Sequence, residues 1–379
     1  MTDADENYFY AYFEVNYGLT SEKLMRKAIE ITARDNSYHP IRDYLNTLIW
    51  DGKERIRYLL KKYMGSDDTE LTYQCVLHFM LGCIMRVFRP GCKYEEMLCL
   101  VGGQGAGKST FFRFLAVRDE WFQDDLEKIG DSKVYEKLAG HWIIELSEMI
   151  GAINAKSIEE LKSFLSRQRE NYRIAYHQYS NDRPRQCVFA GTTNTKQFLP
   201  FDRTGARRFL PVEVHPELAE VHILENESES RAYINQAWAE AMHIYRTGNV
   251  SMQFNKEIQK ELDTYRKQFM QEDTMAGIIQ QWLDEYTGNH VCTLMIWEQA
   301  LGRYVQDMKR FNSLEINEIM HNSVKGWESG PIHRFSKYGS QRSFVRKQDV
   351  NRDSQEGFRP LTVEQQLTLP FEKSLTEGR

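Results

Sequence analysis

The feature that most constrains this 379-residue chain is a glycine-rich segment, Gly102-Gly103-Gln104-Gly105-Ala106-Gly107-Lys108-Ser109. It fits the pattern G-x-x-x-x-G-K-[ST], whose glycines permit positive φ angles and aim backbone N–H groups at phosphate oxygens. An apolar, strand-like run, 97–101, precedes it, and a run typical of a helix, 111–115, follows. Since the positive end of that helix also attracts an anion, the segment predicts a nucleoside triphosphate site. We expect Gly102, Gly103, Gln104, Gly105, Ala106, Gly107, Lys108, Ser109 and Thr110 to bind ATP, with Lys108 at the β- and γ-phosphates and Ser109 at Mg²⁺.

Two later apolar runs also end in polar residues. Trp142-Ile143-Ile144 leads into Glu145 and, three residues on, Glu148. A phosphate site of this kind needs one carboxylate for the metal and one to orient the attacking water. We therefore place Glu145 at the metal with Ser109, while either glutamate could activate water. Cys187–Gly191 leads into Thr192-Thr193-Asn194, where Asn194 is suited to contact the γ-phosphate. The competing interpretations are that the two glutamates are exposed acids at a strand end, and that Thr-Thr-Asn is an ordinary turn.

These runs also predict the fold class. Continuous apolar strands separated by helical spacers are typical of an α/β fold with a parallel sheet covered on both faces. We expect a P-loop core at 71–215, preceded by helices at 1–70 and followed by a helical connector at 216–275. A small helical, winged-helix-like domain at 276–355 and a tail at 356–379 complete the prediction.

Paired arginines follow the third run. Arg207 and Arg208 lie in Asp202-Arg203-Thr204-Gly205-Ala206-Arg207-Arg208-Phe209, a glycine-containing loop. Such a loop suits an arginine finger, a guanidinium that neutralises the transferring phosphoryl group and can come from a neighbouring subunit. Either arginine could be the finger, and pairing with a local carboxylate is the competing interpretation.

The order of these motifs resembles that of the superfamily 3 helicases of the AAA+ class. The motifs are the glycine loop, the strand ending in Glu, the strand ending in Asn and the segment Thr-Gly-x-Arg-Arg-Phe. The chain looks most like the virulence-associated protein E (VapE-type) family of phages and phage-related islands. Three further segments support the narrower likeness: 39–45 with 50–52, 142–148 and 187–194. The resemblance implies a hexameric ring that couples ATP hydrolysis between subunits to movement along single-stranded DNA. It also implies replication of a mobile element in the cytoplasm of a bacterial host, with any primase a separate partner.

Two segments are candidates for DNA contact. Residues 161–210 carry ten Lys or Arg against three acids, and such a patch attracts a phosphate backbone. Runs 174–179 and 185–188 flank turn residues 180–184, which predicts a hairpin with its tip there. The resemblance places DNA contacts on this hairpin, at His177, Arg183 and Arg185. In the last domain a basic and aromatic run, 333–347, suggests a β-ribbon at origin duplex DNA, with contacts at Lys337, Arg342 and Arg346.

Each of the two DNA-binding predictions has an alternative: the hairpin could be an ordinary solvated one, and the last domain could be a packing domain with a charged edge. Two alternatives also exist for the function of the whole chain. It could be a regulatory or phage-defence ATPase that binds nucleic acid without unwinding it, or a small-molecule kinase.

Composition excludes other classes. Lys and Arg total 49 against 54 Asp and Glu, a net charge of −5, which disfavours a globally basic coat protein. The six cysteines form no CxxC pair, so we expect reduced thiols rather than a zinc site. The acidic N-terminus does not resemble a signal peptide, and we expect no apolar stretch to approach the roughly 18 residues that span a bilayer. These features predict a cytoplasmic protein without a membrane partner.

Overall fold

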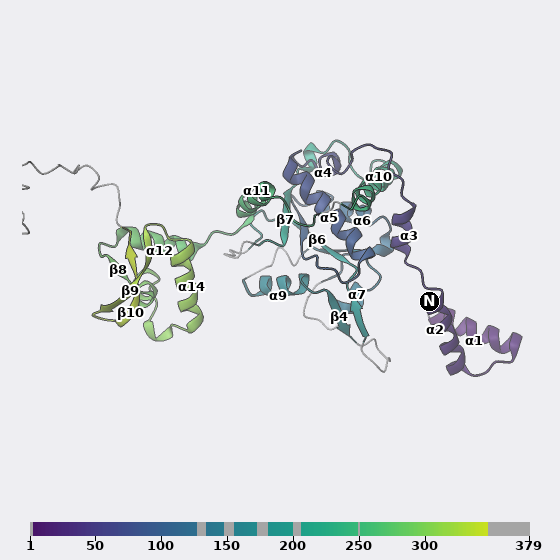
Figure 1. Cartoon of the computed structure of the whole chain (residues 1–379), viewed down its shortest axis with the longest axis horizontal. Coiled ribbons are helices and arrows are strands. Elements are labelled where there is room, and N and C mark those ends of the chain that lie inside the picture. The colour runs from purple at the N-terminus through teal and green to yellow at the C-terminus, as the bar shows by residue number, and fades with distance from the viewer. Residues whose placement is uncertain are drawn as a thin grey trace, which may run out of the picture. The chain divides into compact units, whose positions relative to one another are not determined.

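The computed structural model describes residues 3–126, 134–147, 155–172, 181–199, 206–248 and 251–347. The chain divides into two compact units, residues 1–271 and 272–379 (Figure 1). The finer domain boundaries expected from the sequence stay predictions.

The first unit begins with short helices. These are α1 (Asp3–Tyr17), α2 (Glu22–Asp35), α3 (Pro40–Thr47) and α4 (Leu59–Met64). Arg26 of α2 pairs with Glu6 of α1 at 2.7 Å, which joins the first two helices. Helix α3 begins at Pro40, and the ring of His39 caps it by accepting from the Arg42 N–H.

A five-stranded parallel sheet is the centre of this unit. Its strand order is β2-β3-β6-β1-β7, and Leu98 pairs with Ala190 while Ile144 pairs with Phe189. The three apolar runs form its three central strands, so the prediction of a parallel sheet is confirmed. The bounds are β1 (Met97–Val101), β2 (Phe122–Gln123), β3 (Ile143–Leu146), β6 (Val188–Thr193) and β7 (Phe209–Glu213).

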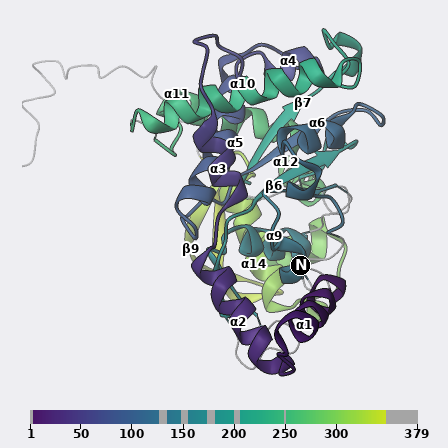
Figure 2. The same ribbon diagram turned by 90° about the vertical axis from the view of Figure 1, so that its right-hand side faces the viewer.

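Helices cover both faces of the sheet. Alternate strand residues enter two separate cores, as the period of two in a strand requires. One core lies against α5 (Glu70–Phe88), α6 (Lys108–Leu115) and α10 (Glu227–Arg246); the other lies against α7 (Val134–Leu138) and α9 (Ala155–Leu165). In both views α10 and α9 lie on opposite sides of the sheet (Figures 1 and 2). Helix α11 (Lys256–Arg266) and short 3₁₀ turns at Asp119–Trp121, Pro216–Leu218 and Lys267–Phe269 complete the unit.

Helix α5 corrects one expectation. Among the described residues it is the one helix long and apolar enough to cross a membrane by length and composition, so the statement that no stretch comes near that length was wrong. Its side chains, from Leu71 to Val87, are mostly buried in the core against the sheet. Helix α5 is therefore a central packing helix of the unit.

The basic segment forms a hairpin, but not where the sequence placed its tip. Strands β4 (Arg169–Tyr172) and β5 (Asn181–Pro184) are antiparallel, with Arg169 opposite Pro184. The expected turn residues 181–184 are thus a strand, because they complete a ladder with 169–172 and the next N–H, of Arg185, donates to the Gln168 carbonyl. Residues 173–180 lie outside the described residues.

The second unit has its own core. Its elements are α12 (Thr274–Glu285), β8 (His290–Val291), α13 (Thr293–Met295), a π-helical turn (Ile296–Ala300), a 3₁₀ turn (Val305–Asp307), α14 (Arg310–Asn322), β9 (Trp327–Phe335) and β10 (Gly339–Arg346). The strands form an antiparallel sheet in the order β8-β10-β9. Trp297, Trp327 and Phe344 pack with α12 and α14 beneath this sheet.

Candidate functional site

The glycine loop connects strand β1 to helix α6. Gly105 and Gly107 have φ angles of +78° and +72°, which side chains rarely tolerate, and Gly107 is the N-cap of α6. Lys108 begins the helix and turns back over the loop, where Nζ donates to the carbonyls of Gly102 at 2.8 Å and Gly103 at 2.7 Å. Burial lowers the pKa of this ammonium from its usual value. The loop thus holds a partly desolvated positive charge beside the N-terminal end of a helix.

The predicted polar strand end meets this lysine. Asn194 follows β6, which lies beside β1 in the sheet, and its Oδ1 accepts from Lys108 Nζ at 2.9 Å. The side chain of Asn194 is exposed to solvent. Loop and amide are therefore adjacent although 86 residues separate them.

Glu145 lies at the end of β3, on the other side of β6. Its Oε1 accepts from Ser109 Oγ at 2.7 Å and from Thr192 Oγ1, while its Oε2 is buried with no hydrogen-bond partner among the described residues. Only 1% of Glu145 is exposed, and this burial raises the pKa of its carboxyl group. A buried carboxylate oxygen without a donor is costly unless a cation binds there.

Lys108, Ser109, Thr192 and Asn194 border one cavity of about 570 Å³, and Glu145 lies behind Ser109 and Thr192. The cavity is lined by Gln104, Gly105, Ala106, Gly107, Lys108, Ser109, Thr110, Ser147, Thr192, Thr193, Asn194 and Thr195. The volume lies within the range usual for small-molecule sites. Within the described ranges no three His, Cys, Asp or Glu residues cluster as a metal site, so a cation here would take other ligands from a bound phosphate and from water.

The arginines lie at the opposite edge of the sheet. The Arg208 carbonyl accepts from the N–H of Met97, the first residue of β1, at 2.7 Å, whereas the glycine loop follows the last residue, Val101. Four residue steps of strand separate these ends by about 13 Å. Both guanidinium groups pair with Glu95. The pairing with a local carboxylate that the competing interpretation expected is therefore observed.

The structure corrects one expected DNA contact. Arg185 is 3% exposed, and its guanidinium pairs with Glu170 and donates to the Phe164 carbonyl at 2.7 Å. A group so enclosed cannot contact a DNA backbone in this structure. Arg183 lies on β5 and is partly exposed, while Glu148 and His177 lie outside the described residues.

The three candidates of the second unit differ in their surroundings. Arg342 is exposed on β10, opposite Ile332 of β9. Lys337 is exposed but pairs with Glu298 at 2.7 Å. Arg346 is partly exposed, but it donates to the carbonyls of Leu283 and Tyr286 and lies over the ring of Trp327, so it has structural contacts and its DNA contact stays a prediction.

Two residues that hold the predicted groups in place, Thr192 beside Glu145 and Glu95 beside the arginines, were not singled out from the sequence. Thr192 stood in the quoted Gly-Thr-Thr-Asn run, and a hydroxyl at the end of a buried strand is a usable signal for a carboxylate partner. Glu95 gave no such signal, because its partners lie 71 to 113 residues further along the chain.

Comparison with known proteins decides the family. The description "Virulence-associated protein E-like domain" matches residues 45–271, more than half of the chain. The chain belongs to the VapE-like family. The VapE-like region contains the glycine loop, Glu145, Asn194, the hairpin and the arginine pair, and it ends where the first compact unit ends.

The comparisons with solved structures and with curated proteins give weaker matches or none. Two structures titled as apo forms of the "NrS-1 C terminal region" share 15% and 16% identity with the chain, with TM-scores of 0.42 and 0.43. Each alignment covers 80% of this chain and 78% of the other. No curated protein matches the chain.

Proposed function

We propose that this VapE-like protein is an ATP-dependent, ring-forming DNA helicase of the AAA+ class that serves replication of a phage-like mobile element. One observation carries the proposal: Lys108 and Ser109 of α6 and Asn194 after β6 line a single cavity, and Glu145 of β3 accepts a hydrogen bond from Ser109. A loop that binds phosphate, a carboxylate for the metal and an amide for the γ-phosphate are the parts that ATP hydrolysis requires.

Each residue then has a task. Backbone N–H groups of residues 102–110 and the Lys108 ammonium bind the phosphates, and Ser109 and Glu145 hold Mg²⁺. The buried Oε2 of Glu145, which has no hydrogen-bond partner in the part of the chain that the structure describes, supports this fit. When bound, Mg²⁺ neutralises charge on the phosphate oxygens and orients them. Asn194, already at Lys108, senses the γ-phosphate, and Glu145 or Glu148 orients the attacking water.

The arginines supply the argument for a ring. Arg207 and Arg208 lie at the edge of the sheet opposite the glycine loop of their own subunit. A finger in that place acts on the nucleotide of a neighbouring subunit, and repeated contacts of this kind close a ring. We propose a hexamer, with ATP bound between subunits.

DNA contacts complete the proposal. Arg183 lies on the hairpin of the basic segment, which we propose contacts single-stranded DNA. The second unit has the order helix, strand, two helices and two strands, which supports a winged helix at origin duplex DNA, with Arg342 on its ribbon. A separate primase and a location in the bacterial cytoplasm belong to the same proposal.

Unwinding of a forked DNA by the purified chain tests the function. We expect ATP- and Mg²⁺-dependent strand separation by the natural protein and neither turnover nor unwinding by Lys108→Ala. ATP turnover that depends on Lys108 but leaves the fork intact would favour the regulatory or defence ATPase. Phosphorylation of a metabolite, in place of release of free phosphate, would favour the kinase.

A further inference from the structure

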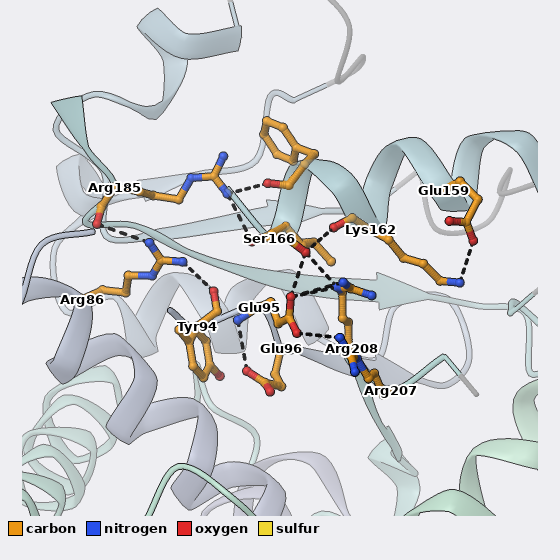
Figure 3. A network of polar contacts seen from close by, with 12 residues as sticks. Arg86, Tyr94, Glu95, Glu96, Glu159, Lys162, Ser166, Arg185, Arg207 and Arg208 are labelled. Atoms are coloured by element: carbon orange, nitrogen blue, oxygen red, sulfur yellow. Dashed lines mark hydrogen bonds and ion pairs between the residues drawn. The ribbon is translucent and has the colours of Figure 1, made fainter. Parts of the chain in front are cut away.

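A polar network joins the arginine pair to the base of the hairpin (Figure 3). Its centre is Glu95, whose side chain is 10% exposed and lies just before β1. Oε1 accepts from Arg207 Nη2 at 3.3 Å, and Oε2 accepts from Arg208 Nε at 3.2 Å. The hydroxyl of Ser166 lies 2.8 Å from the same Oε2.

The two arginines are held unequally. The side chain of Arg208 is 17% exposed, and its Nε also lies 3.0 Å from Ser166 Oγ. The side chain of Arg207 is 64% exposed and makes one contact with Glu95, at 3.3 Å. The Arg207 carbonyl, however, accepts from Arg266 Nη2 at 2.7 Å, so the backbone is fixed while the guanidinium extends into solvent.

The hairpin attaches to the same place. Arg185, which follows β5, donates to the carbonyl of Phe164 near the end of α9 and lies over the rings of Phe164 and Phe189. Ser166 is the first residue after α9. The base of the hairpin and Arg208 are therefore fastened to one helix end, through Arg185 and through Ser166.

We infer that Arg207 is the finger that reaches the neighbouring subunit, and that Glu95, with Ser166 and Arg208, positions it. One carboxylate meets two guanidinium groups here, which leaves a net positive charge for the neighbour's phosphates. Because the hairpin shares the helix end, DNA on the hairpin alters the position of Arg207. This inference rests on the proposed function, since it names the finger and its support within that ring.

Steady-state ATP turnover with and without single-stranded DNA tests it. Arg207→Ala should lower kcat about a thousandfold, as loss of a finger does, with an unchanged melting temperature. Glu95→Gln keeps the shape but not the charge, and should lower kcat about tenfold at an unchanged KM for ATP and reduce stimulation by DNA. Glu120→Gln, which removes an exposed carboxylate paired with Arg118, is the matched control and should change neither.

Two outcomes would overturn the inference alone: a larger kcat loss in Arg208→Ala than in Arg207→Ala, or natural kcat and DNA stimulation in Glu95→Gln. If Glu95→Gln does not fold, Ser166→Ala replaces it, with a smaller loss of kcat and of DNA stimulation expected and natural values again contradicting the inference. Absence of Lys108-dependent turnover in the natural protein would instead overturn the proposed function.

Discussion

Ser109 Oγ donates to Glu145 Oε1 across 2.7 Å, and so links the first turn of α6 to the end of β3. This contact puts a hydroxyl and a carboxylate, the two protein ligands proposed for Mg²⁺, beside the glycine loop. Thr192 donates a second hydroxyl to that same oxygen, so Oε2, which has no partner among the residues described, is the atom left for the metal. Mutations can therefore test Mg²⁺ binding separately from phosphate binding.

Ser109→Ala should raise the Mg²⁺ concentration for half-maximal ATP turnover at least about tenfold, because it removes a proposed ligand and the loss of a group that merely orients a ligand already costs about that much. Ser109→Thr retains the hydroxyl and should restore the natural requirement. A titration of turnover against Mg²⁺ at saturating ATP measures both. An alanine variant with the natural Mg²⁺ requirement would show that Ser109 is not a ligand.

Glu145 should make stability depend on pH. The pKa of Glu145 is raised in the folded protein. Ionisation of Glu145 therefore destabilises the fold once the pH exceeds the pKa of the unfolded chain, and the destabilisation grows until the pH passes the raised pKa of the folded protein. Glu145→Gln removes this loss. We therefore expect the advantage of Glu145→Gln over the natural protein in free energy of unfolding to be larger at pH 8 than at pH 5.

Urea denaturation without Mg²⁺ or nucleotide measures this difference. Glu120→Gln, an exposed site, should show no comparable change between the two pH values. Equal stability of Glu145→Gln and the natural protein at both pH values would mean that water or a bound ion solvates Glu145.

Mixing two inactive variants tests whether the site is shared between subunits. Lys108→Ala removes the phosphate side and Arg207→Ala removes the finger, so rings of both retain some intact interfaces. Random mixing in equal amounts leaves about a quarter of interfaces with both groups, and turnover should recover to about that level. Lys108→Ala mixed with Glu145→Gln should recover nothing, because both residues lie on the same side of the interface. No recovery in the first mixture would place the finger and the loop in one subunit.

Local sequence patterns were enough to predict the three central strands of the parallel sheet. The glycine loop, the strand that ends in Glu145 and the strand that ends in Asn194 are each contiguous in sequence, and parallel strands bring their ends to one edge. The edge strands β2 and β7 were not singled out, since two residues of β2 show no pattern and β7 contains a proline.

Long-range pairing could not be predicted from the same patterns. Arg185 in a basic stretch looks like a surface residue, but Glu170 and the rings of Phe164 and Phe189 enclose it. Asn181 to Pro184 have the composition of a turn, yet pairing with 169–172 extends them, and Pro184 ends the strand, where its missing N–H is tolerated. In each case the deciding partner lies on another element.

The basic segment should therefore separate into a structural and a functional arginine. Arg185→Ala leaves the buried Glu170 with only the looser pairing to Arg167 at 4.0 Å, and should lower the free energy of unfolding by about 3 kcal/mol. Arg183→Ala should lower it less than Arg185→Ala, because Arg183 is partly exposed on β5, but should weaken binding of single-stranded DNA. Chemical denaturation and fluorescence anisotropy with a labelled oligonucleotide measure the two effects. Unaltered DNA affinity in Arg183→Ala would remove this residue from the proposed DNA path.

The second unit offers the same comparison on one strand. Arg342 is exposed on β10, so Arg342→Ala should weaken duplex binding and reduce the salt dependence of the affinity by about one phosphate contact, without a change in melting temperature. Arg346 instead binds the carbonyls that end α12 and lies 4.9 Å from the Trp327 ring centroid. Arg346→Ala should thus lower the melting temperature first, with any loss of DNA binding following from it. Duplex affinity measured across a salt series, beside thermal unfolding, separates them, and an Arg342→Ala variant with the natural salt slope would leave the winged-helix ribbon without its proposed contact.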